Sequence, residues 1–291
     1  MIKQVSKYIS LFVSLLIVVL VLSGCSASKF IPEGKFLLDD AEIRSDVKDV
    51  NPDRLKAYIK QKGNSKWFSL FKIPLGTYAL SGKDSTKWIN KKLRDLGEDP
   101  VLFDSLQTAM TCSDLENVLH GLGYLRATVD YNLDFKKKKK VVVVYNLHPG
   151  PLYHISSVSY DIQDDKIAEF LNTGEEGGFK PGLRVGMPFL TNELDNERKA
   201  LTKYLNNNGY YKFHKDFITY SADSVRGSTD VDLTLHLHKY TANSKSPEEA
   251  HTRYKINDVT YYSNDERNYV PLRQSVLEEN TLIEPGEYFN S

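Results

Sequence analysis

The chain has few cysteines, no excess charge of either sign and a single long hydrophobic run. Each of these features limits the classes of function that the chain can have. Its 291 residues hold two cysteines, Cys25 and Cys112, so at most one intrachain disulfide is available. Lysine and arginine number 38, as do aspartate and glutamate, so the chain lacks the basic field that attracts nucleic acids. The motifs G-x-S-x-G, H-E-x-x-H and the phosphate loop are absent. We therefore expect that the chain does not bind nucleic acids, that it is not an enzyme, and that it has no cofactor or metal site.

The hydrophobic run lies near the N-terminus, from Tyr8 to Leu22, after Lys3 and Lys7. Its length is typical of a secretory signal and is shorter than the roughly 20 residues that span a bilayer. The run ends in the sequence Leu22-Ser-Gly-Cys25, whose spacing resembles a bacterial lipoprotein signal. This resemblance implies that residues 1–24 are removed and that Cys25 carries the lipid anchor. Residues 25–34 then form a lipidated linker, and Cys112 has no disulfide partner.

An internal repeat organises the rest of the chain. The stretch 153–160 matches 254–261 at every apolar or aromatic position, and 36–43 is a looser third copy. All three alternate apolar and polar residues, which is the period of a strand. Downstream, 115–124 parallels 201–210 as a helix closed by glycine.

Each repeat predicts the order strand, helix, helix, strand, strand. The fold class is therefore α+β, with a three-stranded sheet covered by two helices. The first helices are predicted at 51–63 and about 164–173, and the closing strands at 127–135, 141–147, 213–222 and 231–237. The predicted domains are 35–150 with an insertion at 64–112, 151–240 after it, a linker at 241–252, and 253–291 as the start of a third module. The third copy has a first helix near 272–277 but no closing strands, so we expect this sequence to be part of something longer.

The insertion contains the aromatic stretch Trp67–Ile73 and a predicted helix, Ser85–Leu96. This helix places Ile89, Leu93 and Leu96 on one face. Two interpretations of the aromatic stretch stay open. It is either the buried side of the insertion or a segment that enters a membrane interface.

The repeat order, the Gly-Tyr that follows each second helix, and the segment 183–201 together resemble POTRA domains of the BamA/TamA outer-membrane assembly superfamily. The segments 97–103 and 283–291 look like counterparts of 183–201. The lipidated N-terminus is similar to the lipoprotein (TamL-like) form found in Bacteroidota. The resemblance implies an outer-membrane lipoprotein of a Gram-negative bacterium, with periplasmic POTRA modules and a barrel outside this chain. Its partners would be outer-membrane protein clients, other assembly subunits and outer-membrane lipid.

A three-stranded sheet has open edges, and an extended client segment can add a strand there through backbone hydrogen bonds. In POTRA-type sheets the strand after the second helix is an edge. The candidate edge residues are Phe213, Ile218, Tyr220, Val129 and Tyr131.

A second candidate site consists of Lys137, Lys138 and Lys139. These lysines contact either lipid headgroups or an acidic partner, or they form a solvated hairpin tip that has no ligand. His236 and His238 alternate with leucines and are expected on the polar side of one strand. Two other functions stay open as alternatives to the assembly role, namely a stand-alone lipid-anchored adaptor and a lipid-anchored periplasmic hydrolase.

Overall fold

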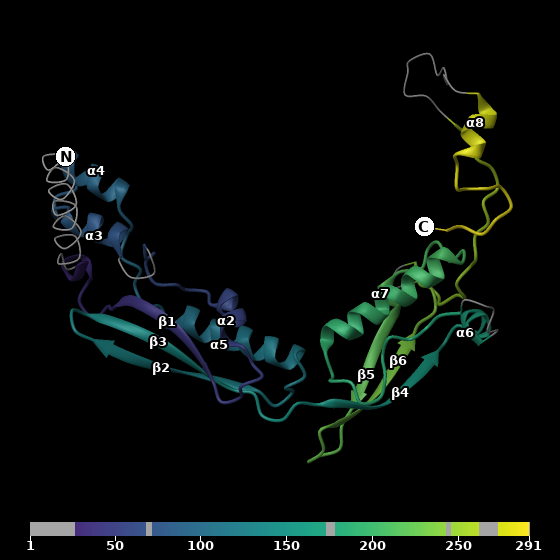
Figure 1. Ribbon diagram of the computed structural model, residues 1–291, viewed down its shortest axis with the longest axis horizontal. Coiled ribbons are helices and arrows are strands. Elements are labelled where there is room, and N and C mark those ends of the chain that lie inside the picture. The colour runs from purple at the N-terminus through teal and green to yellow at the C-terminus, as the bar shows by residue number, and fades with distance from the viewer. Residues whose placement is uncertain (1–26, 68–71, 173–177, 243–245, 262–272, 291) are drawn as a thin grey trace, which may run out of the picture. The chain divides into compact units, whose positions relative to one another are not determined.

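A computed structural model of the protein describes residues 27–67, 72–172, 178–242, 246–261 and 273–290 (Figure 1). These residues form two compact units. The first contains the chain up to His120 and Tyr124–Gly150, and the second contains Gly121–Gly123 and everything from Pro151 onward. Cys25 lies outside the described residues. No helix in the described part is both long and apolar enough to cross a bilayer.

The first unit is built on a three-stranded sheet with the order β1-β3-β2. Strand β1 (Leu37–Ser45) runs parallel to β3 (Lys140–His148), and β2 (Thr128–Lys136) pairs with β3 in antiparallel register. Figure 1 shows α2 (Pro52–Leu55) and α5 (Ser105–Gly121) over one face of this sheet. The central strand, β3, has a neighbouring strand on each side and is buried continuously from Val141 to Tyr145.

The first helix of this unit is much shorter than the predicted 51–63. Asn51 caps α2 by accepting a hydrogen bond from the Asp53 amide at 2.9 Å, and a short 3₁₀ helix, η2 (Lys56–Tyr58), ends it. The backbone then becomes extended at Ile59, whose side chain is buried. Gly63 lies so close to β1 that a Cβ atom there would be 2.7 Å from the Asp39 carbonyl oxygen. Tertiary packing against β1 therefore overrides helical propensity beyond Tyr58.

Two further helices, α3 (Ile73–Leu80) and α4 (Trp88–Leu96), lie side by side beyond the sheet of the first unit (Figure 1). They pack together with η1 (Ala27–Phe30). The predicted helix 85–96 thus begins three residues later than expected, at Trp88. The second helix of the module, α5, begins at Ser105, so the inserted segment ends before the predicted residue 112.

The second unit repeats the same plan with the sheet order β4-β6-β5. Strand β4 (His154–Ile162) runs parallel to β6 (Asp230–Leu237), and β5 (Ile218–Asp223) is antiparallel to β6. Helix α6 (Asp165–Asn172) follows β4, and α7 (Thr191–Asn207) crosses the sheet face in Figure 1. On β6, the alternating residues Val231, Leu233, Leu235 and Leu237 are all buried. The α+β fold class predicted from the repeat is confirmed.

One predicted strand begins too early. The sequence indicated a strand from Phe213, but residues 215–217 form a 3₁₀ helix, η3, and β5 begins at Ile218. Phe213 and Phe217 both point into a core cluster that includes Leu201, Leu205 and Tyr210. The adjacent residues Phe217 and Ile218 also both enter this core, which a straight strand does not allow because successive side chains point to opposite faces, so the chain turns before pairing begins.

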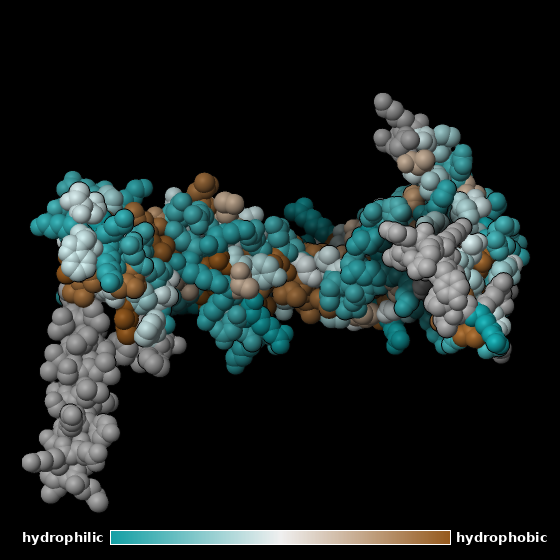
Figure 2. All heavy atoms as spheres, turned by 90° about the horizontal axis from the view of Figure 1, so that it is seen from above, coloured by the Kyte–Doolittle hydropathy of each residue, from teal (hydrophilic) through white to brown (hydrophobic). Residues whose placement is uncertain are grey.

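The third copy is represented by residues 253–261 and 273–290, which cluster with the second unit. Helix α8 (Gln274–Glu279) is close to the first helix expected near 272–277. In the described part of this copy, Lys255 forms one isolated bridge, with Tyr288. The molecular face seen in Figure 2 is mostly hydrophilic, with smaller groups of hydrophobic residues between.

Candidate strand-binding edges

Each module covers the start of its first strand with a short segment of its own chain. In the first unit, the Leu38 amide donates to the Val101 carbonyl and the Phe103 amide donates to the Phe36 carbonyl, both at 2.8 Å. In the second unit, the Ile155 amide donates to Met187 at 2.9 Å. The covering segments, 101–103 and 186–189, lie within the stretches that the repeat analysis matched.

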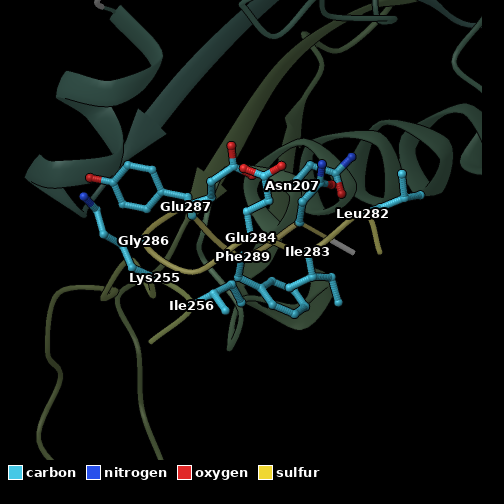
Figure 3. A pocket seen from close by; sticks show the side chains of 11 residues that line it. Asn207, Lys255, Ile256, Leu282, Ile283, Glu284, Gly286, Glu287 and Phe289 are labelled. Atoms are coloured by element: carbon cyan, nitrogen blue, oxygen red, sulfur yellow. The ribbon is translucent and has the colours of Figure 1, made fainter. Parts of the chain in front are cut away.

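The third copy has the same arrangement. The Ile256 amide donates to the Glu287 carbonyl at 2.8 Å, and the Phe289 amide donates to Tyr254 at 3.0 Å. The covering segment encloses a shallow hollow of about 380 Å³ (Figure 3). Glu284 and Glu287 point to one side of it, and Ile256 and Phe289 to the other. This hollow is a by-product of the strand contact, and we assign no ligand to it.

The other edge of each sheet ends in the strand that follows the second helix, and on β5 the ladder shows which backbone groups face outward. The His238 amide donates to the Phe217 carbonyl at 2.8 Å, so this pair is a hydrogen-bonded one. Hydrogen-bonded and non-hydrogen-bonded pairs alternate along an antiparallel ladder. The amides and carbonyls of Ile218, Tyr220 and Ala222 therefore point away from β6.

The backbone groups of β2 alternate in the same way. The Leu147 carbonyl accepts a hydrogen bond from Asp46 on the β1 side, so its β2 neighbour Val129 is turned outward. The Val129 amide donates to the Glu116 side chain of α5 at 2.9 Å. Glu116 thus occupies the first outward position of this edge, and Tyr131, Leu133 and Phe135 supply the next outward backbone groups by alternation.

The side chains of the predicted edge residues lie mostly inside the modules. Phe213 is 2% exposed and is not on the edge strand at all, whereas Ile218 and Val129 are buried on their strands. Tyr131 and Tyr220 are half-buried, and the Tyr220 hydroxyl donates to the Leu194 carbonyl of α7 at 3.2 Å. An incoming strand would therefore meet backbone groups on these residues rather than their side chains.

A buried carboxyl that sequence reasoning missed lies on α7, next to Tyr160 of β4. Glu197 of α7 is 3% exposed, accepts a hydrogen bond from the Gly182 amide at 2.7 Å, and interacts with the Tyr160 hydroxyl. Burial raises the pKa of Glu197, and burial next to Glu197 raises the pKa of Tyr160 to about 12. Glu197 is followed by basic residues on a polar helix, so no sequence signal distinguishes it from a solvated glutamate.

The lysine cluster forms the tip of the β2–β3 hairpin. Lys137, Lys138 and Lys139 are all exposed, and Lys138 and Lys139 have left-handed backbone angles, with φ of 65° and 55°. The Lys139 carbonyl accepts a hydrogen bond from Leu37 at 2.8 Å, so the end of the tip is tied to β1. The structure thus places these lysines on a tight turn, and a headgroup or partner contact stays a prediction.

His236 and His238 lie side by side on the solvent face of the second sheet, with ring centroids 6.4 Å apart. Each ring nitrogen has a hydrogen-bond partner. His236 bonds Asp161 and Ser221, both at 2.8 Å. Across the residues that the structure describes, no cluster of three or more histidine, cysteine or acidic side chains is arranged to hold a metal ion.

Taken together, the fold defines a class: tandem three-stranded βααββ modules, each with its first strand covered at the start and the strand after the second helix at an edge.

Among solved structures, the chain is similar to POTRA3-5 of BamA from Haemophilus influenzae, with 14% identity and a TM-score of 0.38 over 89% of this chain and 83% of that one. It is also similar to POTRA1-2 of the periplasmic domain of Omp85 from Anabaena, with 13% identity and a TM-score of 0.29 over 72% of this chain and 100% of that one. A third similar structure is BamA from Haemophilus ducreyi lacking POTRA domains 1-3, with 12% identity and a TM-score of 0.34 over 69% of this chain and 29% of that one. Neither the protein-family models nor the curated proteins contain a match.

Proposed function

We propose that this chain is the periplasmic POTRA region of an outer-membrane lipoprotein that takes part in the assembly of outer-membrane proteins, and that it has no catalytic role. In this proposal the modules bind client or partner strands by β-augmentation at β5 and β2. One observation carries it. Tyr220 and Ala222 turn their amides and carbonyls away from the sheet, while the opposite edge is covered at its start by 186–189.

Backbone recognition suits a protein that must accept many different clients, because every extended segment offers the same amides and carbonyls. It also keeps binding weak. Each hydrogen bond contributes a net ~0.5–1.5 kcal/mol, and only Ile218, Tyr220 and Ala222 face outward on β5. A client held by so few bonds would be released readily, as transfer to an insertion step requires.

The lipid anchor belongs to the same proposal. The spacing of Leu22-Ser-Gly-Cys25 supports lipidation of Cys25, which would tether the modules to the outer membrane on its periplasmic side. Mass spectrometry of the N-terminal peptide tests this part directly. A mature protein that begins with a diacyl- or triacylated Cys25 supports it, and an unmodified or uncleaved N-terminus overturns it.

The edge itself is tested with proline at Ala222. This residue is exposed and its amide faces outward, so Ala222→Pro removes one donor for an incoming strand and keeps the β5–β6 ladder, as proline is tolerated at edge positions. A photo-crosslinking residue at Asp223, the last residue of β5, reports on bound client in the full-length protein. Ala222→Ser is the matched control because it keeps the amide.

We expect Ala222→Pro to lower client crosslinking several-fold with an unchanged circular dichroism spectrum, and Ala222→Ser to leave crosslinking at the wild-type level. Ser221→Pro removes an inward amide of the ladder and should weaken the sheet itself. Equal crosslinking yields from wild type and Ala222→Pro would overturn the assignment of β5 as the strand-accepting edge.

A further inference from the structure

The helix α4 exposes three of its four apolar side chains and buries the polar side chain of Asn90. Trp88 is 74% exposed, Ile89 52% and Leu96 68%. Positions 88, 89 and 96 fall on one side of a helix, because seven- and eight-residue spacings close two turns. The sequence predicted that Ile89, Leu93 and Leu96 share one face; in the structure Ile89 and Leu96 are exposed and Leu93 is half-buried.

Polar side chains hold the opposite side of α4 against the loop that precedes it. Asn90 is 8% exposed, accepts a hydrogen bond from the Gly82 amide at 2.8 Å and donates to the Asp84 carbonyl at 2.7 Å. Arg94 donates to the Gly82 carbonyl at 2.8 Å. These bonds fix the rotation of α4 about its axis, so the outward apolar face is a built feature of the fold.

The same docking contacts join α4 to the N-terminal end of the described chain. The Arg94 guanidinium lies 5.3 Å from the ring centroid of Phe30 and 5.6 Å from that of Tyr78, and these two rings pack edge to face at 5.1 Å. Ala27 is buried in a cluster with Leu75 of α3. The helices α3 and α4 are thus fixed to Ala27 and Phe30, which lie within the predicted linker 25–34.

The distance from Cys25 to this body is short. Ala27 lies two steps along the chain from Cys25, with Ser26 between them, and an extended chain spans at most about 3.6 Å per residue. A lipid on Cys25 would therefore hold Ala27 within about 7 Å of its own attachment point. The tether is too short to let the α3–α4 body leave the bilayer surface.

The charge around the exposed face also suits a lipid surface. The segment from Lys83 to Leu96 holds five basic residues, Lys83, Lys87, Lys91, Lys92 and Arg94, against two acidic ones, Asp84 and Asp95. Lys91 and Lys92 are exposed, and the described part of the chain gives neither an ion pair. Tryptophan, aliphatic side chains and lysines on one short helix are the composition of interfacial segments.

We propose that α4 lies on the bilayer that holds the Cys25 lipid, with Trp88, Ile89 and Leu96 among the lipid headgroups and Lys91 and Lys92 at anionic phosphates. The inference rests on the proposed lipidation of Cys25. The lipid then acts as more than a tether, because it and α4 together give the first module two contacts with the membrane and thereby a defined orientation.

The chain offers its own reporter, since its two tryptophans are Trp67 and Trp88. Trp67→Phe leaves Trp88 as the sole emitter in the full-length, lipid-anchored protein. The protein is placed in vesicles of phosphatidylethanolamine and phosphatidylglycerol, with or without brominated acyl chains that quench fluorescence on contact. We expect Trp88 emission to shift to shorter wavelength and to be quenched at least about twofold, as insertion by 5–10 Å brings it to the acyl boundary.

Two charge substitutions provide the matched comparison. Leu96→Glu changes the proposed contact face, whereas Leu106→Glu changes an equally exposed leucine on α5, both 68% exposed in the native protein. Neither side chain is in a core, so both variants should fold. We expect Leu96→Glu to abolish quenching of Trp88 and Leu106→Glu to leave it unchanged.

The outcomes separate this inference from the proposed function. If mass spectrometry shows acylated Cys25 but Trp88 is not quenched, the α4 contact is wrong and the lipoprotein assignment stands. A blue-shifted but unquenched Trp88 would mean that a protein surface covers α4, which also overturns the inference. An unacylated Cys25 removes both the inference and the anchor on which it rests.

Discussion

Asp164 joins two segments of the second unit through hydrogen bonds. It is fully buried, with 0% exposure. One carboxylate oxygen accepts hydrogen bonds from the Lys166 and Ile167 amides at 3.0 and 3.2 Å, which caps α6. The other oxygen accepts a hydrogen bond from the His251 amide at 2.6 Å and so ties the segment before the third copy to the module.

The cost of Asp164→Ala follows from these contacts. Loss of a helix cap costs about 1 kcal/mol, within a range of about 0.5–2. Loss of a hydrogen bond to a charged group costs about 1.5–3 kcal/mol. We therefore expect the free energy of unfolding of the second unit to fall by about 2–5 kcal/mol, which is the sum of the two losses.

The measurement is urea unfolding followed by circular dichroism and tyrosine fluorescence. Asp165→Ala is the matched control, because Asp165 is exposed in the first turn of the same helix, where a carboxylate contributes about 0.3–1 kcal/mol. Asp164→Asn keeps an acceptor for α6 but turns an amide toward His251, so it should fall between the two. A loss below about 1 kcal/mol for Asp164→Ala would refute the reasoning, because it would be no larger than the exposed control.

Three other properties follow from single residues. Lys138→Gly should raise the free energy of unfolding by about 0.5–1 kcal/mol, because glycine adopts the left-handed backbone of this hairpin position without a Cβ penalty. Urea titration measures this change, and a loss of stability would contradict the prediction. Burial raises the pKa of the Cys112 thiol from the ordinary 9.0 to about 11, so at pH 8 iodoacetamide should alkylate native Cys112 roughly 100-fold more slowly than the urea-unfolded chain, and equal rates would rule this out. Burial lowers the pKa of His251 below its ordinary value of 6.5, so His251 contributes stability above pH 6.5 that is lost as the pH falls through its folded-state pKa. The urea midpoint of the second unit should drop between pH 7.5 and pH 5, and His251→Gln should reduce that drop; an unchanged pH profile in the variant would assign the dependence to other groups.

The repeat could be predicted from the sequence because alternation and helical spacing are local properties. Val231, Leu233, Leu235 and Leu237 read as a half-buried strand in the sequence and are one in the structure. Long-range packing decided the elements that differ. The helix after Pro52 stops early because Ile59 and Gly63 pack against β1, and no local pattern carries that information.

The candidate edges divide in the same way. The sequence pointed to the strands after the second helices, and those strands are the sheet edges in both units. It did not show that Glu116 already binds the first outward amide of β2. Nor did it show that Phe213 belongs to the core rather than to β5.

By itself, the sequence determined the order of elements, the α+β class and the repeat, because each depends on residues close together in the chain; the signal that ends at Cys25 stays a prediction. The tertiary structure alone decided which backbone groups of β5 and β2 face outward, since a one-residue change of register would reverse them. It also decided that α4 buries Asn90 and exposes Trp88, because the rings against which Arg94 of this helix packs, Phe30 and Tyr78, lie outside the helix. Amphipathic spacing defines a face, and only packing determines where that face points.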